Sequence, residues 1–301
     1  IEEIAEKLCF SFYKGSLKKK KTFMKLLKEC ANFKEDYKLI YKHFFMSKFC
    51  RIKLTPEEIS SFIDKKVLNY EDSILLAYLK GMLSGFSYEQ SIKQVVIDEA
   101  QDYTTLQYII ISKIFKKASF TILGDVNQNI NPYYKHETLE DLMQIFPCSK
   151  YIELQKTYRS SKEIIDYTNK ILGLNHVTAI RRENSKPVIY RSNISNLKKT
   201  ILDDLNVLSL EYLKMAIIAK DHYIATKLYN TIKNDINVSL INDNTKGINS
   251  DLVIIPAYLA KGLEFDCVII YNDPLSKYKR NEKNLLYVAC TRAQHELYIY
   301  N

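Results

Sequence analysis

The sequence predicts an α/β protein in which parallel β-strands are flanked by helices and preceded by a mainly helical segment. Two observations indicate this class. Up to residue 93 the apolar residues recur at helical spacing, whereas from Gln94 onward short apolar runs alternate with helical patterns. Strand–helix alternation is typical of a parallel sheet that is covered on both faces. The length of 301 residues is enough for two domains or for one large one.

The helical segment is predicted over residues 1–93. Apolar residues recur three or four positions apart within 23–27, 37–45 and 59–63. Pro56 follows Thr55, and Glu58 lies three residues after Thr55. This arrangement predicts a helix start with Thr55 as the N-cap.

After Gln94 the predicted strands are short apolar runs bounded by turn residues. They are Val95–Ile97, Phe120–Leu123, Tyr151–Leu154, Val188–Tyr190, Ala216–Ala219, Leu252–Ile255, Val268–Tyr271 and Leu297–Tyr300. Helical patterns lie between several of them, at Thr105–Phe115, Ser161–Leu172, His222–Ile232 and Asn281–Thr291. Because ligand sites in parallel sheets form at the carboxyl ends of the strands, the residues just after each strand are the candidates for function.

The net charge of the chain is positive, but it indicates little about function. The chain has 44 Lys and Arg residues against 35 Asp and Glu residues, a net charge of +9, yet only seven of the basic residues are Arg. Much of the excess therefore reflects a Lys-rich background. The 13 basic residues between Lys14 and Lys53 are a clustered exception, which fits either a polyanion-binding segment or a solvated helical face.

The cysteines and the apolar runs exclude several classes of protein. The six cysteines are scattered without a C-x-x-C pair, so neither a zinc site nor a disulfide framework is predicted, and a reducing, cytoplasmic setting is expected. No apolar run approaches the roughly 18 residues that a membrane span needs, so no membrane partner is expected.

Two adjacent carboxylates, Asp98 and Glu99, follow the predicted strand Val95–Ile97. An Asp in this place can hold Mg²⁺, and the neighbouring Glu can orient and deprotonate a water that attacks a phosphoryl group. The pair taken alone fits equally well with a plain helix N-terminus, where acidic residues are favoured.

Polar residues also follow the next two predicted strands. Gln128 lies four residues after Gly124, where it can sense a γ-phosphate or simply belong to a Gly-Asp-Asn turn. Tyr158 and Arg159 precede a helix for which Ser160 or Ser161 is the predicted N-cap. In one interpretation this pair supplies a stacking ring and a guanidinium that binds phosphate. In the other, Arg159 is an ordinary surface arginine.

Two further motifs lie near the end of the chain. The segment Lys261–Asp266 leads into the predicted strand Val268–Tyr271, and Gly262 within it is consistent with a simple turn. Arg292 ends the helical pattern Asn284–Thr291, a place where a positive charge can also serve only to compensate the helix dipole.

The order and spacing of these motifs are more specific than any one of them. Asp-Glu-Ala-Gln-Asp, Gly-Asp-x-x-Gln, Tyr-Arg-Ser, Lys-Gly-Leu-Glu-Phe-Asp and Tyr-Val-Ala-x-Thr-Arg-Ala closely resemble the later motifs of superfamily 1 helicases of the UvrD/Rep/PcrA type, over residues 95–300. The individual residues within these motifs are most similar to those of the HelD, or helicase IV-like, branch. Its members include proteins that act on RNA polymerase.

The resemblance implies two RecA-like domains that clamp ATP and Mg²⁺. It implies that Asp98 holds Mg²⁺, that Glu99 activates the attacking water and that Gln128 contacts the γ-phosphate. Arg159 and Arg292 would stabilise the transferring phosphoryl group. The nucleotide would be bound by Tyr158, which stacks near the adenine, and by Gly262 and Glu264, of which Glu264 contacts the sugar. Tyr133 and Tyr134 lie where the family stacks a nucleic-acid base, and Tyr258 replaces a usual His.

The resemblance also implies a domain plan. Residues 1–93 would be a 1B-like or inserted helical segment, 94–150 the trailing part of the first RecA-like domain, and 151–301 the second. The 102 residues from Arg159 to Lys261 leave no room for a 2B insertion. The chain has no G-x-x-x-x-G-K-[ST] phosphate loop and starts at Ile1, so we expect an amino-terminal half upstream and no efficient ATP hydrolysis by this chain alone.

Three functions remain open at this point. The first is the carboxyl-terminal motor portion of an ATP-dependent helicase or translocase, acting on single-stranded DNA or a duplex junction or on DNA-bound RNA polymerase. The second is an RNA polymerase-binding recycling factor whose nucleotide site is mainly a conformational switch. The third is a decayed fragment, which the integrity of all five motifs argues against.

Overall fold

The computed structural model describes residues 38, 40–42, 55–63, 68–131, 134–174, 177–180, 188–192, 196–245, 247, 250–274 and 276–301. They form two compact units. Unit 1 holds the described residues up to Asp98, with 103–123 and 141–149, and unit 2 holds 99–102, 124–140 and 150–301. Most of the basic cluster between Lys14 and Lys53 lies outside the described residues, as does Tyr133.

The described residues of unit 1 that precede its sheet and have regular structure are helical, as predicted. Helix α4 (Pro56–Ile63) begins after Thr55, whose Oγ1 accepts a hydrogen bond of 3.2 Å from the Glu58 backbone N–H. The Glu58 carboxylate in turn accepts a bond of 2.7 Å from the Thr55 N–H, so the predicted N-cap is confirmed. Helix α5 (Tyr70–Ser84) follows, and Tyr41, Ile59 and Leu76 form a small buried apolar cluster.

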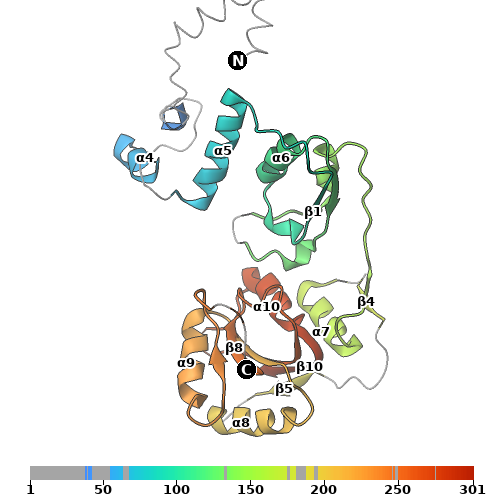
Figure 1. The fold of residues 1–301 in the computed structure, drawn as a ribbon. Helices are drawn as coiled ribbons and strands as arrows, with labels where there is room; N and C mark the ends of the chain where they lie inside the picture. Colours follow the sequence, from blue (N-terminus) through green and yellow to red (C-terminus); the bar gives the residue numbers. More distant parts are fainter. Residues whose placement is uncertain are drawn as a thin grey trace, which may run out of the picture. The chain divides into compact units, whose positions relative to one another are not determined.

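The sheet of unit 1 is a parallel pair of strands joined through a helix (Figure 1). Strand β1 (Gln94–Ile97) pairs with β2 (Ser119–Ile122), and α6 (Thr105–Ile114) lies between them in the chain. Tyr108 on α6 is fully buried and meets the Phe146 ring edge-on at 6.2 Å between centroids. Both strands predicted in this region are confirmed, and each is followed directly by a turn that belongs to unit 2.

Unit 2 is built on a six-stranded sheet in which every pairing is parallel. The strand order is β5–β10–β9–β6–β8–β7. The strands are β5 (Ile189–Arg191), β6 (Met215–Ala219), β7 (Ser239–Leu240), β8 (Leu252–Pro256), β9 (Phe265–Tyr271) and β10 (Ala293–Tyr300). All residues of β6 and β8 are buried, because a central parallel strand is covered on both faces.

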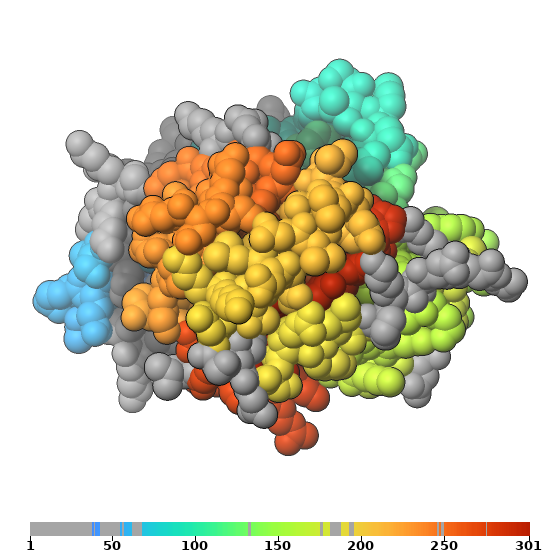
Figure 2. Space-filling view, turned by 90° about the horizontal axis from the view of Figure 1, so that it is seen from below, coloured from blue at the N-terminus to red at the C-terminus, as the bar shows by residue number. Residues whose placement is uncertain are grey.

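Helices cover both faces of this sheet and divide its core into two clusters. Side chains alternate along each strand, so Ile217 and Ile269 belong to one cluster while Ile218 and Ile270 belong to the other. The first cluster lies under α8 (Leu197–Leu208) and α9 (His222–Ile232), and Figure 2 looks onto this face, where the two helices lie side by side in yellow and orange. The second lies under α7 (Lys162–Leu172) and α10 (Lys283–Cys290).

One predicted strand is wrong. Tyr151–Leu154 forms no strand and is exposed throughout, and Leu154 is 84% exposed. The strand in this region is instead β3 (Lys156–Thr157), which pairs in parallel with β4 (Thr178–Ala179). An apolar run becomes a strand only where a partner strand supplies hydrogen bonds, and β4 meets the chain at Lys156 rather than before it.

Four short 3₁₀ segments complete the described structure: η1 (Ala100–Asp102), η2 (Val126–Gln128), η3 (Glu140–Gln144) and η4 (Arg280–Glu282). No helix in the described part of the chain is both long and apolar enough to cross a membrane. The observed class is α/β with RecA-like parallel sheets flanked by helices, as the sequence predicts. The division at residues 93/94 and 150/151 stays a prediction.

Candidate functional site

The turn after β1 places Glu99 in an unusual backbone conformation. Its φ angle is +49°, in the left-handed region that residues other than glycine seldom adopt. Two contacts hold it there: the Asp102 N–H donates to the Glu99 carbonyl at 3.0 Å, and Gln101 Nε2 donates to Glu99 Oε2 at 2.6 Å. Strain of this kind tends to occur at functional sites, where the surrounding structure must impose it.

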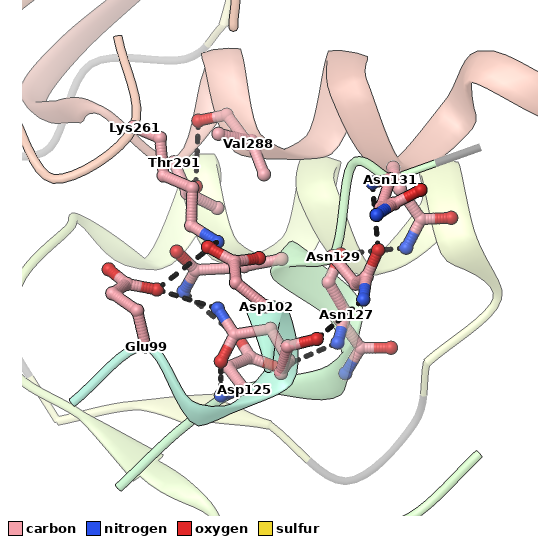
Figure 3. Close-up of polar contacts among 12 residues, drawn as sticks. Glu99, Asp102, Asp125, Asn127, Asn129, Asn131, Lys261, Val288 and Thr291 are labelled. Atoms are coloured by element: carbon pink, nitrogen blue, oxygen red, sulfur yellow. Dashed lines mark hydrogen bonds and ion pairs between the residues drawn. The ribbon is translucent and has the colours of Figure 1, made fainter. Parts of the chain in front are cut away.

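Gln101 joins this turn to the turn after β2, and Figure 3 shows Glu99 and Asp102 of the first turn near Asp125 of the second. The Gln101 side chain is fully buried, and its Oε1 accepts a bond of 2.9 Å from the Asp125 N–H. Its backbone carbonyl accepts a bond of 2.6 Å from Asn129 Nδ2. Gly124 is required at this contact, because a Cβ on it would lie 2.7 Å from Gln101 Oε1. The two strand ends are therefore locked into one polar cluster.

Gln128 and Arg292 meet within this cluster. Arg292 Nη2 donates to Gln128 Oε1 at 2.9 Å, and Gln128 Nε2 donates to Asp125 Oδ2 at 3.0 Å. Helix α10 is tied to the same turn, because Asn284 Nδ2 donates to the carbonyl of Asn127 at 2.7 Å. Two residues 164 positions apart in the sequence are thus in direct contact.

The Arg292 guanidinium is completely buried. Its Nε donates to the Val288 carbonyl at 3.0 Å and its Nη1 to the Leu263 carbonyl at 3.3 Å. Burial is the main reason why the pKa of Arg292 falls to about 10, and the nearby positive charge of Arg159 adds to the fall. The bond to Val288 compensates the end of α10, so Arg292 both caps its helix and points into the cluster.

Arg159 and Glu264 form an ion pair in unit 2. Arg159 Nη2 lies 2.5 Å from Glu264 Oε1, and Gln294 Nε2 donates to Glu264 Oε2 at 2.6 Å. Burial alone would raise the pKa of Glu264, but the Arg159 charge and these hydrogen bonds outweigh it, so the pKa lies below its usual value.

Lys261 contacts both carboxylates of the first turn. Its Nζ lies 2.6 Å from Asp102 Oδ2 and 3.3 Å from Glu99 Oε2, and its side chain is only 12% exposed. Gly262, with a φ of +78°, turns the chain directly after it, as a glycine tolerates more readily than other residues. Gln101, Asp102 and Lys261 stand within the sequence motifs, but the sequence alone predicts no role for them. Their place inside the motifs was the available signal.

The structure gathers some of the predicted site residues and not others. Glu99, Gln128, Arg159, Glu264 and Arg292 lie in unit 2 and are joined by the contacts and charges above, whereas Asp98 is assigned to unit 1. The predicted tyrosines that the structure describes are Tyr134, Tyr158 and Tyr258. Tyr158 is 72% exposed, Tyr258 donates to Asp243 at 3.0 Å, and Tyr134 contacts His136. Ser161 is the N-cap residue of α7, as predicted, but its side chain makes no capping hydrogen bond.

Two family models match the chain, and each matched region contains part of this site. The model of the UvrD/REP helicase N-terminal domain matches residues 7–137, and that of the UvrD-like helicase C-terminal domain matches residues 251–300. The first contains the turns after β1 and β2. The second contains Lys261, Glu264 and Arg292.

Curated relatives of this chain include ATP-dependent DNA helicases and the RecBCD enzyme subunit RecB. The chain is 32% identical over 115 residues to the ATP-dependent DNA helicase Rep of Escherichia coli (36% of this chain, 17% of Rep). It is 25% identical over 130 residues to srs2 of Schizosaccharomyces pombe, also an ATP-dependent DNA helicase (42% and 14%). It is 27% identical over 157 residues to RecB of Buchnera aphidicola (48% and 13%). The matches thus cover less than a fifth of each relative.

A solved structure described as the C-terminal domain of a possible DNA helicase from Lactobacillus plantarum is 30% identical, with a TM-score of 0.40, and covers 48% of this chain and 86% of that one. The polar cluster lies within the regions that the two helicase family models match. From these matches and the curated relatives, the chain contains UvrD/Rep-like superfamily 1 helicase domains.

Proposed function

We propose that this chain is the carboxyl-terminal motor portion of an ATP-dependent DNA helicase or translocase. One observation carries the proposal: a carboxylate (Glu99), an amide (Gln128) and a buried arginine (Arg292) from three separate segments belong to one cluster. Arg292 bonds Gln128, Gln128 bonds Asp125, and Gln101 bonds both the Asp125 N–H and the Glu99 carboxylate. Phosphoryl transfer needs positioned cations and a residue that orients the nucleophile, and this cluster supplies both.

Within this proposal Glu99 acts as the base. Its carboxylate accepts a proton from the water that attacks the γ-phosphate, and the P–O bond to the ADP leaving group breaks. Arg292 and Arg159 stabilise the negative charge that develops on the transferring group. Gln128 is placed to respond, because it already bonds the Arg292 guanidinium and can exchange that contact for a phosphate oxygen.

Asp98 is the proposed holder of Mg²⁺. Among the described residues no group of three or more His, Cys, Asp or Glu side chains is arranged to hold a metal ion. Mg²⁺ is usually bound by one or two carboxylates together with substrate phosphates and waters, and Asp98 is one such carboxylate. Asp98 is exposed and directly follows the buried Ile97, so it stands at the strand end. When bound, Mg²⁺ would neutralise phosphate charge.

The remaining assignments concern the nucleotide and the nucleic acid. The exposed ring of Tyr158 is proposed to stack near the adenine, and Glu264, beside Gly262, to contact the sugar, with Arg159 turning from Glu264 to phosphate. Tyr134 and Tyr258 are proposed to contact single-stranded DNA or a duplex junction by base stacking.

Replacing Glu99 by Gln tests the proposal in the full-length protein, since this chain has no phosphate loop of its own. We expect ATP turnover to be lost while ATP affinity, measured with a fluorescent nucleotide, changes little, because the amide keeps the shape but cannot take a proton. Glu71→Gln on α5 is the matched control and should turn over normally. Unchanged turnover in Glu99→Gln would rule the proposal out.

A narrower proposal places the protein in the HelD-like branch, as an ATPase or nucleotide switch that remodels DNA-bound RNA polymerase. It is supported by the residues within the motifs and by the short span from Arg159 to Lys261, which leaves no room for a 2B insertion. Co-purification with RNA polymerase, with no stimulation of ATP hydrolysis by single-stranded DNA, is the expected result. A salt-sensitive affinity for bare DNA without polymerase binding would contradict it.

A further inference from the structure

Lys261 is the one cation that meets both carboxylates of the turn after β1, among the ion pairs of the described residues. It reaches this turn from a position about 160 residues away in the sequence, and Figure 3 shows its side chain pointing between Glu99 and Asp102. An ammonium group that is largely buried needs such anionic partners, since its burial without them is costly.

The backbone around Lys261 fixes the direction of its side chain. Ala260 before it is fully buried in the core of unit 2, and Gly262 after it adopts the left-handed conformation. Two residues further, Glu264 is anchored by Arg159 and Gln294. The ammonium is therefore presented to the carboxylates by a constrained turn rather than by a freely moving surface loop.

The contact falls on the atom that the proposed chemistry uses. Glu99 Oε2 accepts from Gln101 Nε2 at 2.6 Å and faces Lys261 Nζ at 3.3 Å. A carboxylate oxygen engaged by two N–H donors is a poorer acceptor for the proton of a water molecule, because those donors must be displaced first.

We propose that Lys261 restrains Glu99 in the nucleotide-free molecule and that Asp102 is the anchor to which the ammonium withdraws when Glu99 turns to its substrate water. The inference rests on the proposed function of Glu99. Lys261 is a positioning residue in this scheme, since it acts through Glu99. The two distances support the division of roles: Asp102 is the closer partner at 2.6 Å, so Lys261 keeps an ion pair when the longer contact is broken.

The scheme predicts opposite effects from two substitutions in the same ion triad. In the full-length protein without nucleic acid, Lys261→Met should raise kcat for ATP hydrolysis by about fivefold, a factor in the range of a partly exposed ion pair, with KM nearly unchanged. Asp102→Asn should lower kcat, because the ammonium then has Glu99 as its only carboxylate partner in the triad. Lys261→Arg keeps the charge and should keep the low basal rate.

A purely structural role for Lys261 gives a different pattern. Loss of a structural ion pair would lower kcat in both Lys261→Met and Asp102→Asn, and a basal rate in Lys261→Met at or below that of the wild type would overturn the proposal. The same holds where the wild-type rate is too low to measure and Lys261→Met shows no gain. Glu99→Gln separates the two levels, since unchanged turnover there defeats the proposed function itself, whereas lost turnover there with an unaltered Lys261→Met defeats only the restraint.

A second measurement on the present chain needs no activity. If the ammonium and the Asp102 carboxylate interact, the losses of melting temperature in Lys261→Met and Asp102→Asn should not add up in the double variant, which should lose less than their sum. Additive losses would show that the contact is absent and would also overturn the proposal. Lys233→Met at the end of α9 with Asp166→Asn on α7 is the control pair, because these two helices cover opposite faces of the sheet, and its losses should be additive.

Discussion

At the level of single residues, the guanidinium of Arg292 makes more directed contacts than any lysine in its place could. It donates to the carbonyls of Val288 and Leu263 and to Gln128 Oε1 while being completely buried. A lysine ammonium is a point charge and cannot reproduce this planar set of donors.

Arg292→Lys should therefore lower the free energy of unfolding by about 1–3 kcal/mol, the usual cost of leaving buried acceptors without donors. Urea unfolding followed by far-ultraviolet circular dichroism measures this. Arg280→Lys on η4, where the side chain is exposed, is the matched control and should match the wild type. Equal stability of Arg292→Lys and the wild type would contradict the prediction.

At the level of elements, the helices of unit 2 start in different ways. Helix α9 is capped by Asp221, whose Oδ1 accepts from the Ile224 N–H at 2.9 Å. Helix α7 starts at Ser161, whose Oγ is buried and has no hydrogen-bond partner among the described residues, while the neighbouring Ser160 donates to the Ala293 carbonyl at 2.6 Å. The same class of residue thus caps one helix and not the other.

Asp221→Ala should cost about 1 kcal/mol in the free energy of unfolding, because it removes the acceptor for an orphan N–H of α9. Ser161→Ala should cost nothing or stabilise slightly, since it removes a buried hydroxyl without a bond. Thermal unfolding of the two variants compares them directly. A larger loss in Ser161→Ala than in Asp221→Ala would show that the capping assignments are reversed.

At the level of the whole molecule, the carboxylate of Asp204 ties three elements of unit 2 together. Arg191 on β5 donates to it from Nε at 2.9 Å and from Nη2 at 2.7 Å, and the hydroxyl of Tyr300 on β10 also donates to this carboxylate on α8. Burial alone would raise the pKa of Asp204, but these donors outweigh it, so the pKa lies below the usual 3.8.

The pH dependence of stability follows from that shift. Because the pKa of Asp204 is lower in the folded than in the unfolded state, its contribution is fully present above the usual value and is lost as the pH falls through the folded value. The melting temperature of Asp204→Asn should lie below that of the wild type at pH 7, and the difference should shrink below about pH 4. A difference that stays constant from pH 7 to pH 3 would show that the ionised carboxylate is not what stabilises this contact.

Local sequence patterns determined much of the fold of this protein. The spacing of apolar residues predicts the helix His222–Ile232, which is α9. The buried strands β6 and β8 each differ by one residue from the predicted strands Ala216–Ala219 and Leu252–Ile255. These elements were predictable because side chains a few residues apart decide periodicity and capping. The conformation of Tyr151–Leu154 could not be predicted in this way. An apolar run becomes a strand only beside a partner strand, and that partner comes from elsewhere in the chain.

The candidate site divides in the same way. The sequence by itself marked Glu99, Gln128 and Arg292 by the motifs in which they stand. Only the tertiary structure decided which of these side chains meet, that Arg292 is buried rather than a surface cap, and that Lys261 lies on the carboxylates of Glu99 and Asp102. Contacts between residues about 160 positions apart depend on how the strands are ordered in the sheet, and no local pattern encodes that order.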